Sequence, residues 1–365
     1  MKKTLLATAI AGAIAASGMA VTNAQAATVY DQDGTKVDVY GRIALGVAGG
    51  GPEWTTRDGD RVAQNNDEAF VDVFSRLGLR LSHQVTSDMS AFGRLEWRFR
   101  ADESGNRNGN NFDAFSETRQ AYLGLRSNTW GTIQAGNFDS FFNQAVTIPF
   151  DVYIDRGLEF AGHPTQSRGD SIGYITPNLE GFQVYMQAKH YSNRGQNEGA
   201  NPDTFEDGTT VAGQGGLVYE IDGLRLAAGV VDDVVEGDGG NDELRYGATV
   251  SYEFVPGFSA RLGYEGRDDN EVNGGGFDTW GLGASYSINQ WAFNADIYDV
   301  DPDNGDSRTS WALGSYYNVS SAFQVFLELQ QADQATVNIT LDGLDSDISA
   351  DGDDVYWLTG ARYFF

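Results

Sequence analysis

The chain contains no cysteine, so disulfide bonds cannot stabilise it and metal centres built on thiolates are excluded. Histidine is scarce as well, with three in the whole chain: His83, His163 and His190. A transition-metal site made from histidine and cysteine is therefore not expected. We predict that the protein holds no metal and no other cofactor.

Long apolar runs are also missing after residue 26, where no stretch approaches the roughly 20 residues of a transmembrane helix. This excludes a helical membrane protein. Basic side chains are few: 24 Lys and Arg stand against 52 Asp and Glu, for a formal net charge of −28. Such acidity argues against nucleic acid and anionic lipid surfaces as partners.

The first residues have the three parts of a secretory signal peptide. Lys2 and Lys3 form a basic start, residues 5–16 are apolar, and Ala24-Gln25-Ala26 is a small-x-small cleavage site. A buried N-terminal helix is the alternative, but it does not explain why the three parts occur in this order. We predict that 1–26 is removed, which leaves one domain, 27–365, of 365 − 26 = 339 residues with net charge −28 − 2 = −30.

The rest of the chain alternates between apolar and polar residues with a period of two. The odd positions of 37–47 and of 291–297 are apolar or glycine, whereas the positions between them are mostly polar or small. This period is typical of strands with one apolar and one polar face. Sixteen such segments are expected, beginning near residues 37, 69, 89, 117, 131, 170, 182, 210, 224, 243, 258, 277, 291, 308, 323 and 354.

The connections between these segments alternate in length. Short ones such as Ser87-Asp88 and Asn289-Gln290 are separated by long polar ones such as 49–67, 192–209 and 332–353. Strict alternation predicts an all-β fold, a sixteen-stranded antiparallel transmembrane β-barrel with a water-filled lumen. A soluble β-sandwich also alternates, but the even strand number, the export signal and the aromatic strand ends favour the barrel. In the last segment the odd positions, ending at Tyr363 and Phe365, are expected to face lipid.

With these features, the chain resembles the general diffusion porins of Gram-negative outer membranes. The segments that carry the resemblance are "ATVYDQDGTKVDVYGR" after the cleavage site, "SRLGLRLSHQV", "ETRQAYLGLRS", "WGTIQAGNFDS", "DRGLEFAG" and the aromatic end. Their order and spacing cover the whole mature chain. The resemblance implies a homotrimer of sixteen-stranded barrels, with Tyr363 and Phe365 in a signal for the barrel-assembly machinery.

One long connection, Phe138 to Arg168, is too apolar for a surface loop and is expected to fold into the barrel, where it narrows the lumen. The resemblance places Asp155 and Glu159 of "DRGLEFAG" on this constriction. Solvated loop acids are the alternative in a chain with 52 acids. Arg156 could partly neutralise Asp155.

Arginines are expected on the wall opposite this loop. The resemblance assigns this role to Arg42, Arg76, Arg119 and Arg168, and strand parity supports Arg42 and Arg76. Arg119 has the parity of Ala121 and Leu123, so a bulge or an unusual outer face is required. A further row of basic side chains, a ladder along the lumen, is expected on one strand. A purely structural role, in which these arginines pair with Glu96, is equally consistent with the sequence. The residues of this ladder are Arg94, Glu96, Arg98 and Arg100.

These features predict a multi-pass protein of the Gram-negative outer membrane that passes small polar solutes and ions by passive diffusion, with a preference for cations. No catalytic set is evident. Two alternatives remain: a structural or adhesive barrel with a plugged lumen, and an outer-membrane hydrolase. Outer-membrane lipid and lipopolysaccharide are the expected surroundings, with the acidic stretches 301–306 and 342–354 as possible points of divalent-cation bridging. Glu103, in the connection 101–115, is a candidate contact between subunits.

Overall fold

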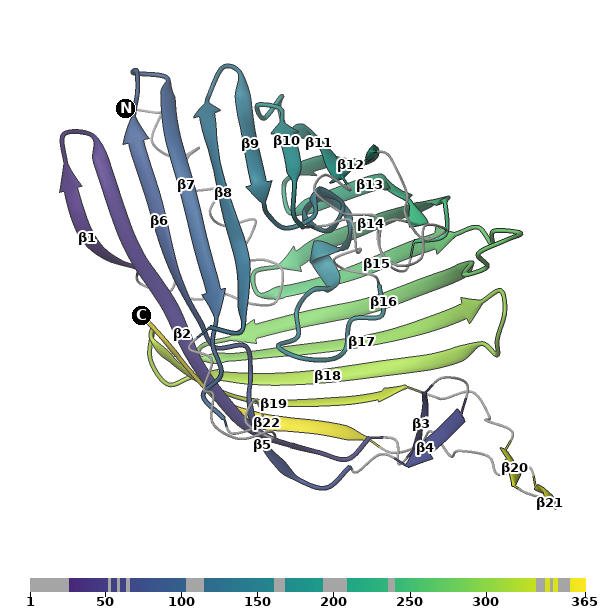
Figure 1. The fold of residues 1–365 in the computed structure, drawn as a ribbon. Helices are drawn as coiled ribbons and strands as arrows, with labels where there is room; N and C mark the ends of the chain where they lie inside the picture. Colours follow the sequence, from purple (N-terminus) through teal and green to yellow (C-terminus); the bar gives the residue numbers. More distant parts are fainter. Residues whose placement is uncertain are drawn as a thin grey trace, which may run out of the picture.

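The computed structural model describes residues 26–51, 54–57, 60–63, 66–102, 115–160, 168–192, 209–235, 240–332, 339–341, 344–346 and 355–365. Strands make up most of this structure (Figure 1). They are β1 (Ala27–Gln32), β2 (Thr35–Gly49), β3 (Trp54–Arg57), β4 (Asp60–Ala63), β5 (Ala69–Asp72), β6 (Arg76–Gln84), β7 (Met89–Arg98), β8 (Glu117–Ser127), β9 (Gly131–Asn137), β10 (Ser171–Ile175), β11 (Phe182–Ser192), β12 (Thr209–Ile221), β13 (Leu224–Asp233), β14 (Glu243–Val255), β15 (Phe258–Arg267), β16 (Phe277–Ile288), β17 (Trp291–Pro302), β18 (Arg308–Asn318), β19 (Phe323–Ala332), β20 (Ile339–Leu341), β21 (Leu344–Ser346) and β22 (Tyr356–Phe364).

One antiparallel sheet closes on itself, because β2 pairs with β22 along one edge and with β5 and β6 along the other. The sheet contains 18 strand segments. Two pairs of segments share a single place in the barrel: β5 and β6 follow one another along β2, and β1 continues the line of β22 beside β2. The barrel is thus 18 − 2 = 16 strands around, and closure removes the sheet edges that hydrocarbon could not satisfy. The predicted sixteen-stranded barrel is confirmed.

The strands begin within two residues of the positions predicted from the period of two, but two details differ. The strand expected at residue 69 is interrupted at 73–75, between β5 and β6. The sequence analysis also missed β1, which pairs with the start of β2 through a tight turn at Asp33 and Gly34. Both turn residues have positive φ, at 52° and 73°. The dipeptide Asp-Gly is a signal for such a hairpin.

The two faces of the sheet differ as the alternation requires. Along β17 exposed and buried residues alternate strictly: Phe293 and Ile297 are exposed, while Asn294 and Asp296 are buried inside. Ile297 lies directly opposite Leu282 in the adjacent strand β16, so apolar side chains form continuous rows on the outside. Such rows match the lipid-facing band of a membrane barrel. No helix in the described part of the chain is long and apolar enough to cross a bilayer.

The inside of the barrel is partly filled by the segment that follows β9. Residues 141–150 form helical turns, including η2 (Asn143–Thr147) and η3 (Ile148–Phe150), and lie within the ring of strands (Figure 1). Their apolar side chains pack on the inner faces of β12, β13 and β17. Gly216 of β12 permits the close approach, since a Cβ there would lie 2.7 Å from the Cβ of Ala145. The prediction that this connection folds inward is confirmed for 138–160, whereas 161–167 lie outside the described residues.

Candidate pore constriction

The first half of the inward loop is fastened to the barrel wall by hydrogen bonds with side chains of the strands β11, β13 and β14. At its start, the backbone N–H of Phe141 donates to the side-chain oxygen of Gln187 on β11 at 2.9 Å. Arg225 of β13 donates to the carbonyl oxygen of Ala145 at 2.6 Å, and Thr249 of β14 donates to that of Val146, also at 2.6 Å. These bonds satisfy backbone groups that the irregular helical turns leave unpaired.

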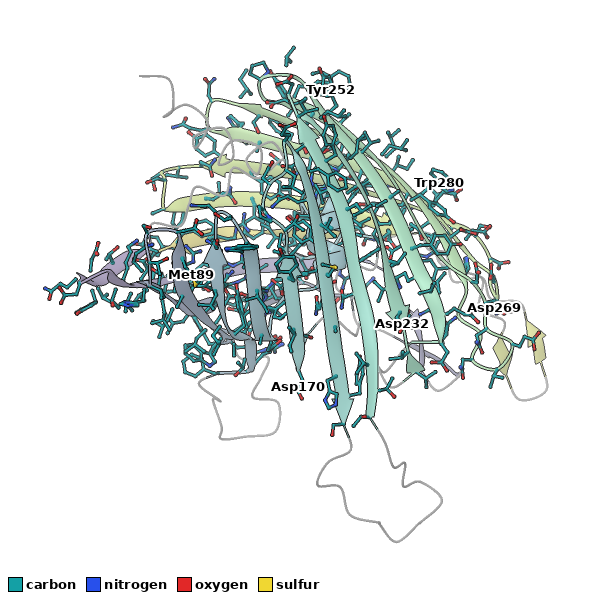
Figure 2. All side chains as sticks on the ribbon, turned by 90° about the horizontal axis from the view of Figure 1, so that it is seen from above. Met89, Asp170, Asp232, Tyr252, Asp269 and Trp280 are labelled. Carbon is teal, nitrogen blue, oxygen red and sulfur yellow. The ribbon has the colours of Figure 1, made fainter. Side chains whose placement is uncertain are left out.

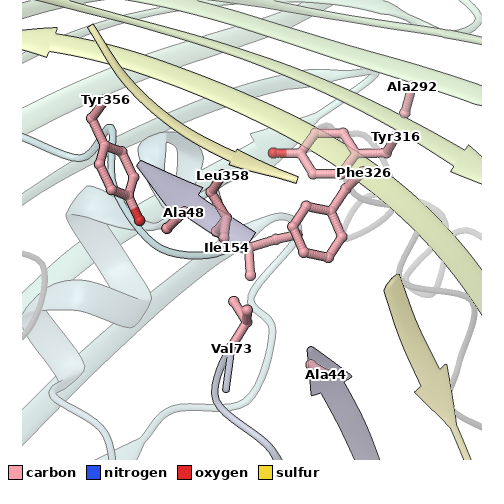
Figure 3. Packing of buried hydrophobic residues seen from close by; sticks show 9 residues of the cluster. All are labelled: Ala44, Ala48, Val73, Ile154, Ala292, Tyr316, Phe326, Tyr356 and Leu358. Atoms are coloured by element: carbon pink, nitrogen blue, oxygen red, sulfur yellow. The ribbon is translucent and has the colours of Figure 1, made fainter. Parts of the chain in front are cut away.

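The second half of the loop is fastened to β17, β18 and β19. Tyr153 donates its hydroxyl hydrogen to Asp296, with an O···O distance of 2.7 Å. Glu328, which is 3% exposed, accepts the backbone N–H of Ile154 at 2.6 Å and that of Asp155 at 3.2 Å. Figure 3 shows Ile154 among Val73, Phe326 and Leu358, in a cluster that joins loop and wall. The loop is therefore held against one side of the barrel, and the opposite wall bounds the free lumen.

That opposite wall has a row of arginines in direct register. Arg42 on β2 lies opposite Arg76 on β6, which in turn lies opposite Arg98 on β7. Like charges directly opposite one another destabilise a sheet unless counter-charges offset them. Arg42 donates from Nε to the carbonyl oxygen of Phe74 at 3.0 Å. As strand parity predicted, Arg42 and Arg76 point away from the exposed face that Ile43 occupies.

The main counter-charge is Glu96, whose side chain is fully buried on the inner face of β7. Its carboxylate accepts hydrogen bonds from Arg76 at 3.1 Å, from Arg94 at 2.9 Å and from Arg119 at 2.8 Å. The hydroxyl of Tyr40 donates a further bond to it at 2.8 Å. One carboxylate thus orients three guanidinium groups, so the expected ladder of Arg94 and Glu96 exists as an ion-paired network.

Arg119 reaches this network through a bulge. The pairing of β7 with β8 shifts between Glu96, which lies opposite Gln120, and Trp97, which lies opposite Thr118. Arg119 is the extra residue, and the shift turns its side chain inward, where it is 9% exposed. The bulge that the parity of Arg119 demanded is therefore present.

Two more carboxylates form ion pairs with these arginines, at the end of the barrel where the long connections lie. Glu117 accepts hydrogen bonds from Arg168 at 2.7 Å, and pairs with Arg98 at 3.1 Å. Asp139, at the start of the inward loop, pairs with Arg119 at 2.9 Å and with Arg168 at 3.5 Å. Arg168 follows the inward loop in the sequence, and these ion pairs make it part of the arginine wall.

Arg100 lies outside strand β7. It lies two residues after the strand ends at Arg98, and its side chain is exposed. Among the four ladder residues expected from the sequence, Arg94, Glu96 and Arg98 thus lie on β7, and a role for Arg100 in the ladder stays a prediction.

The two acids taken from "DRGLEFAG" have partners other than the arginine wall. Glu159 pairs with Arg308 at 2.7 Å and accepts a hydrogen bond from Ser310 at 2.8 Å, both on β18. Asp155 accepts the hydroxyl of Tyr356 at 2.7 Å and lies 3.9 Å from Nε of Arg156. The structure thus attaches both acids to the loop side of the lumen. Arg156 lies beside Asp155, as the sequence suggested.

The arginine wall carries a surplus of positive charge. Its six arginines are accompanied by three carboxylates, which leaves 6 − 3 = 3 positive charges; the groups are Arg42, Arg76, Arg94, Arg98, Arg119 and Arg168 with Glu96, Glu117 and Asp139. On the loop side, Asp155 with Arg156 and Glu159 with Arg308 balance. The sequence analysis missed Glu117 and Asp139, although both lie in quoted segments, "ETRQAYLGLRS" and "WGTIQAGNFDS".

The aromatic end of the chain has the predicted orientation. Tyr363 is 48% exposed, while Leu358, Arg362 and Phe364 are buried on the inner face. Phe365 forms two backbone hydrogen bonds with Gly41. Its N–H donates to the carbonyl oxygen of Gly41 at 3.1 Å, and its own backbone oxygen accepts the N–H of Gly41 at 2.8 Å. The chain end therefore contributes directly to closing the barrel.

The histidines do not form a metal site with acids, since the described ranges contain no group of three or more potential ligands. His83 shares a hydrogen bond of 2.7 Å with the hydroxyl of Thr35, and both are exposed. His190 is exposed on β11, and His163 lies outside the described residues. Glu103 and most of 342–354 lie outside them as well.

Comparisons of the sequence with known proteins find similarity to porins. A family model described as Gram-negative porin matches residues 5–336. A "Monosaccharide porin" from Halomonas sp is 29% identical over 377 residues, covering 90% of this chain and 94% of the relative. "Outer membrane porin F" from Salmonella typhimurium is 26% identical over 297 residues, covering 79% of this chain and 67% of the relative.

Solved structures share the fold at lower identity. The "Anion-selective porin from Comamonas acidovorans" superposes with a TM-score of 0.67 at 18% identity and covers 91% of this chain and 100% of that one. The OmpF of Salmonella typhi, solved in a complex with daunomycin, gives 0.62 at 17% identity, with 93% and 100% covered.

Proposed function

This chain belongs to the Gram-negative porin family, and we propose that its barrel is an open channel for passive diffusion of small hydrophilic solutes and ions across the outer membrane. One observation carries this proposal: a closed barrel whose inward loop is fastened to one wall, opposite a polar wall of arginines and carboxylates. Charged groups on both sides of a narrow water column favour polar over apolar solutes. Because the Halomonas relative is named a monosaccharide porin, simple sugars are suitable neutral probes.

We further propose that small cations are preferred, and that this preference arises outside the constriction. Exposed acids gather at the ends of strands next to the long connections; among them are Asp67, Glu68, Asp170, Asp242, Asp268, Asp269, Glu271, Asp301, Asp303 and Asp306. Figure 2 shows Asp170, Asp232 and Asp269 at one end of the strands and Tyr252 at the other. The arginine surplus of the wall opposes these acids. Their field spans about 30 Å at 0.01 M salt but about 3 Å at 1 M, so the preference should weaken steeply with salt.

The assembled state that we propose is a homotrimer in outer-membrane lipid and lipopolysaccharide. Support comes from family membership and from the apolar outer rows of the barrel. A fold relative, OmpT of Vibrio cholerae, is described in a trimer form; it is 17% identical with a TM-score of 0.59. We propose that a signal peptide, 1–26, directs export and that Tyr363 and Phe365 are recognised by the barrel-assembly machinery.

Current across a planar bilayer tests the proposal directly. Purified protein should insert in discrete conductance steps, and liposomes that contain it should swell in solutions of small sugars. A barrel with a plugged lumen would insert without current. A hydrolase would cleave ester or peptide probes, and loss of that cleavage on replacing a histidine would favour the enzyme instead.

A further inference from the structure

The outer face of the barrel carries an apolar hollow on β16, β17 and β18, far from the lumen. Its volume is about 350 Å³. Ala284 of β16 lies directly opposite Ala295 of β17, and both form the floor of the hollow. Ser315 of β18 extends the floor toward the short turns, because it lies opposite Phe293. The barrel surface therefore has a recess within the apolar rows that face outward.

Large apolar side chains border this recess. Phe258, Tyr286 and Phe293 lie side by side on β15, β16 and β17, and all three are exposed on the outer face. Leu313 and Leu327, on β18 and β19, border the recess as well. Among the described residues that line it, none carries a charge. A charged ligand therefore finds no partner here, whereas a hydrocarbon chain would bury apolar surface on every side that it contacts.

Aromatic residues at the short turns show how deep the hollow lies. Trp291, the first residue of β17, stacks on Phe293 with ring centroids 5.8 Å apart and contacts Tyr317 of β18 at 4.7 Å. Tyr317 donates its hydroxyl hydrogen to Gln290 in the adjoining turn at 3.2 Å. Trp and Tyr side chains with one polar end mark the interface of a membrane protein. Ala295 lies four residues further along the tilted strand, roughly 13 Å beyond Trp291, which is the level of acyl chains.

Resting on the proposed place of the barrel in the outer membrane, we propose that this hollow binds one acyl chain of a phospholipid in the periplasmic leaflet. Short turns of such barrels face the periplasm, so the hollow lies in that leaflet. An acyl chain on Ala284 and Ala295 gains the van der Waals contacts that these small side chains leave open. A stable contact with a second copy takes roughly 800 Å² from each partner, whereas the recess has room for a single chain.

The test counts the phospholipid that stays on the full-length protein after extraction in mild detergent. Native mass spectrometry gives the number of bound lipids per chain, and chromatography with mass spectrometry of the extract identifies them. Ala295→Leu fills the floor of the hollow. Ala248→Leu is the matched control, because Ala248 is exposed on the same outer face, on β14 and outside the hollow. We expect Ala295→Leu to retain roughly tenfold less phospholipid than the wild type and Ala248→Leu, the effect of leaving about two methylene groups unburied.

Several results would overturn the inference. They are a wild type that retains no phospholipid, equal retention by the wild type and Ala295→Leu, and lipid A as the retained lipid. Loss of the oligomer in Ala295→Leu with its phospholipid still bound would assign the hollow to a second copy instead. If Ala295→Leu does not assemble, Ala284→Leu fills the same floor from the neighbouring strand and takes its place.

Conductance recorded on the same preparations separates this inference from the channel function. Ala295 faces away from the lumen, so Ala295→Leu should conduct as the wild type does. A wild type that binds the phospholipid but carries no current would overturn the channel function and leave the lipid site in place. A conducting wild type without bound phospholipid would do the reverse.

Discussion

The buried carboxylate of Glu96 offers the sharpest test of how the arginine wall is held. Replacing Glu96 with Gln removes the charge that pairs with Arg76, Arg94 and Arg119, at 3.1, 2.9 and 2.8 Å. Removing one partner of a dry buried ion pair costs about 3–5 kcal/mol. Here the arginines are 11–28% exposed to the lumen, so water stabilises them in part. We therefore expect Glu96→Gln to lower the free energy of unfolding by about 2–4 kcal/mol.

Glu117→Gln is the matched control, because Glu117 also pairs with two arginines but is 34% exposed. Exposed pairs contribute about 0–1 kcal/mol each, so this variant should lose no more than about 1–2 kcal/mol. Both free energies can be measured by urea titration in detergent, with tryptophan fluorescence and heat-modifiable gel mobility as probes. If Glu96→Gln proves no less stable than Glu117→Gln, the carboxylate does not organise the wall.

Four further predictions concern the loop, the acids and the assembly. Gly216→Val should push the inward loop off the wall, since a Cβ added at this position would lie 2.7 Å from the Cβ of Ala145. We expect the free energy of unfolding to fall by about 1–3 kcal/mol and the conductance to change, and an unchanged conductance would contradict the packing. Arg308→Gln should free Glu159 and raise the cation preference at ~1 M salt, where an unchanged reversal potential would show that Glu159 remains out of the ion path. Deleting Phe365 removes two backbone hydrogen bonds to Gly41 and should leave unassembled chains in the periplasm, whereas normal levels of heat-resistant oligomer would count against an assembly role. Unheated detergent extracts should elute as trimers in size-exclusion chromatography with light scattering, and a monodisperse monomer in mild detergent would refute the trimer.

The strand pattern could be predicted from the sequence because a lipid-facing barrel imposes a period of two on every strand. The same period of two also predicted an irregularity at Arg119, because an inward side chain there has the wrong parity for a regular strand. The structure has the required bulge, opposite Glu96 and Trp97. The hairpin of β1 was missed because its residues lack an apolar face, and all six are exposed. Pairing, and not burial, holds this strand in place.

The partners of the constriction residues were harder to predict. Glu159 and Arg308 are separated by 149 positions, and only the three-dimensional arrangement of loop and barrel brings them together. Sequence parity predicts which face of a strand is lumenal, but it cannot orient the side chains of an irregular loop.

Reversal potential in a KCl gradient, measured on the wild-type protein at low and at high salt, tests the central claim most directly. A water-filled pore with acids outside and an arginine surplus at the constriction should prefer cations near about 0.01 M salt and lose most of that preference near 1 M. An anion preference at low salt, a preference that does not change with salt, or membranes that carry no current would contradict the account.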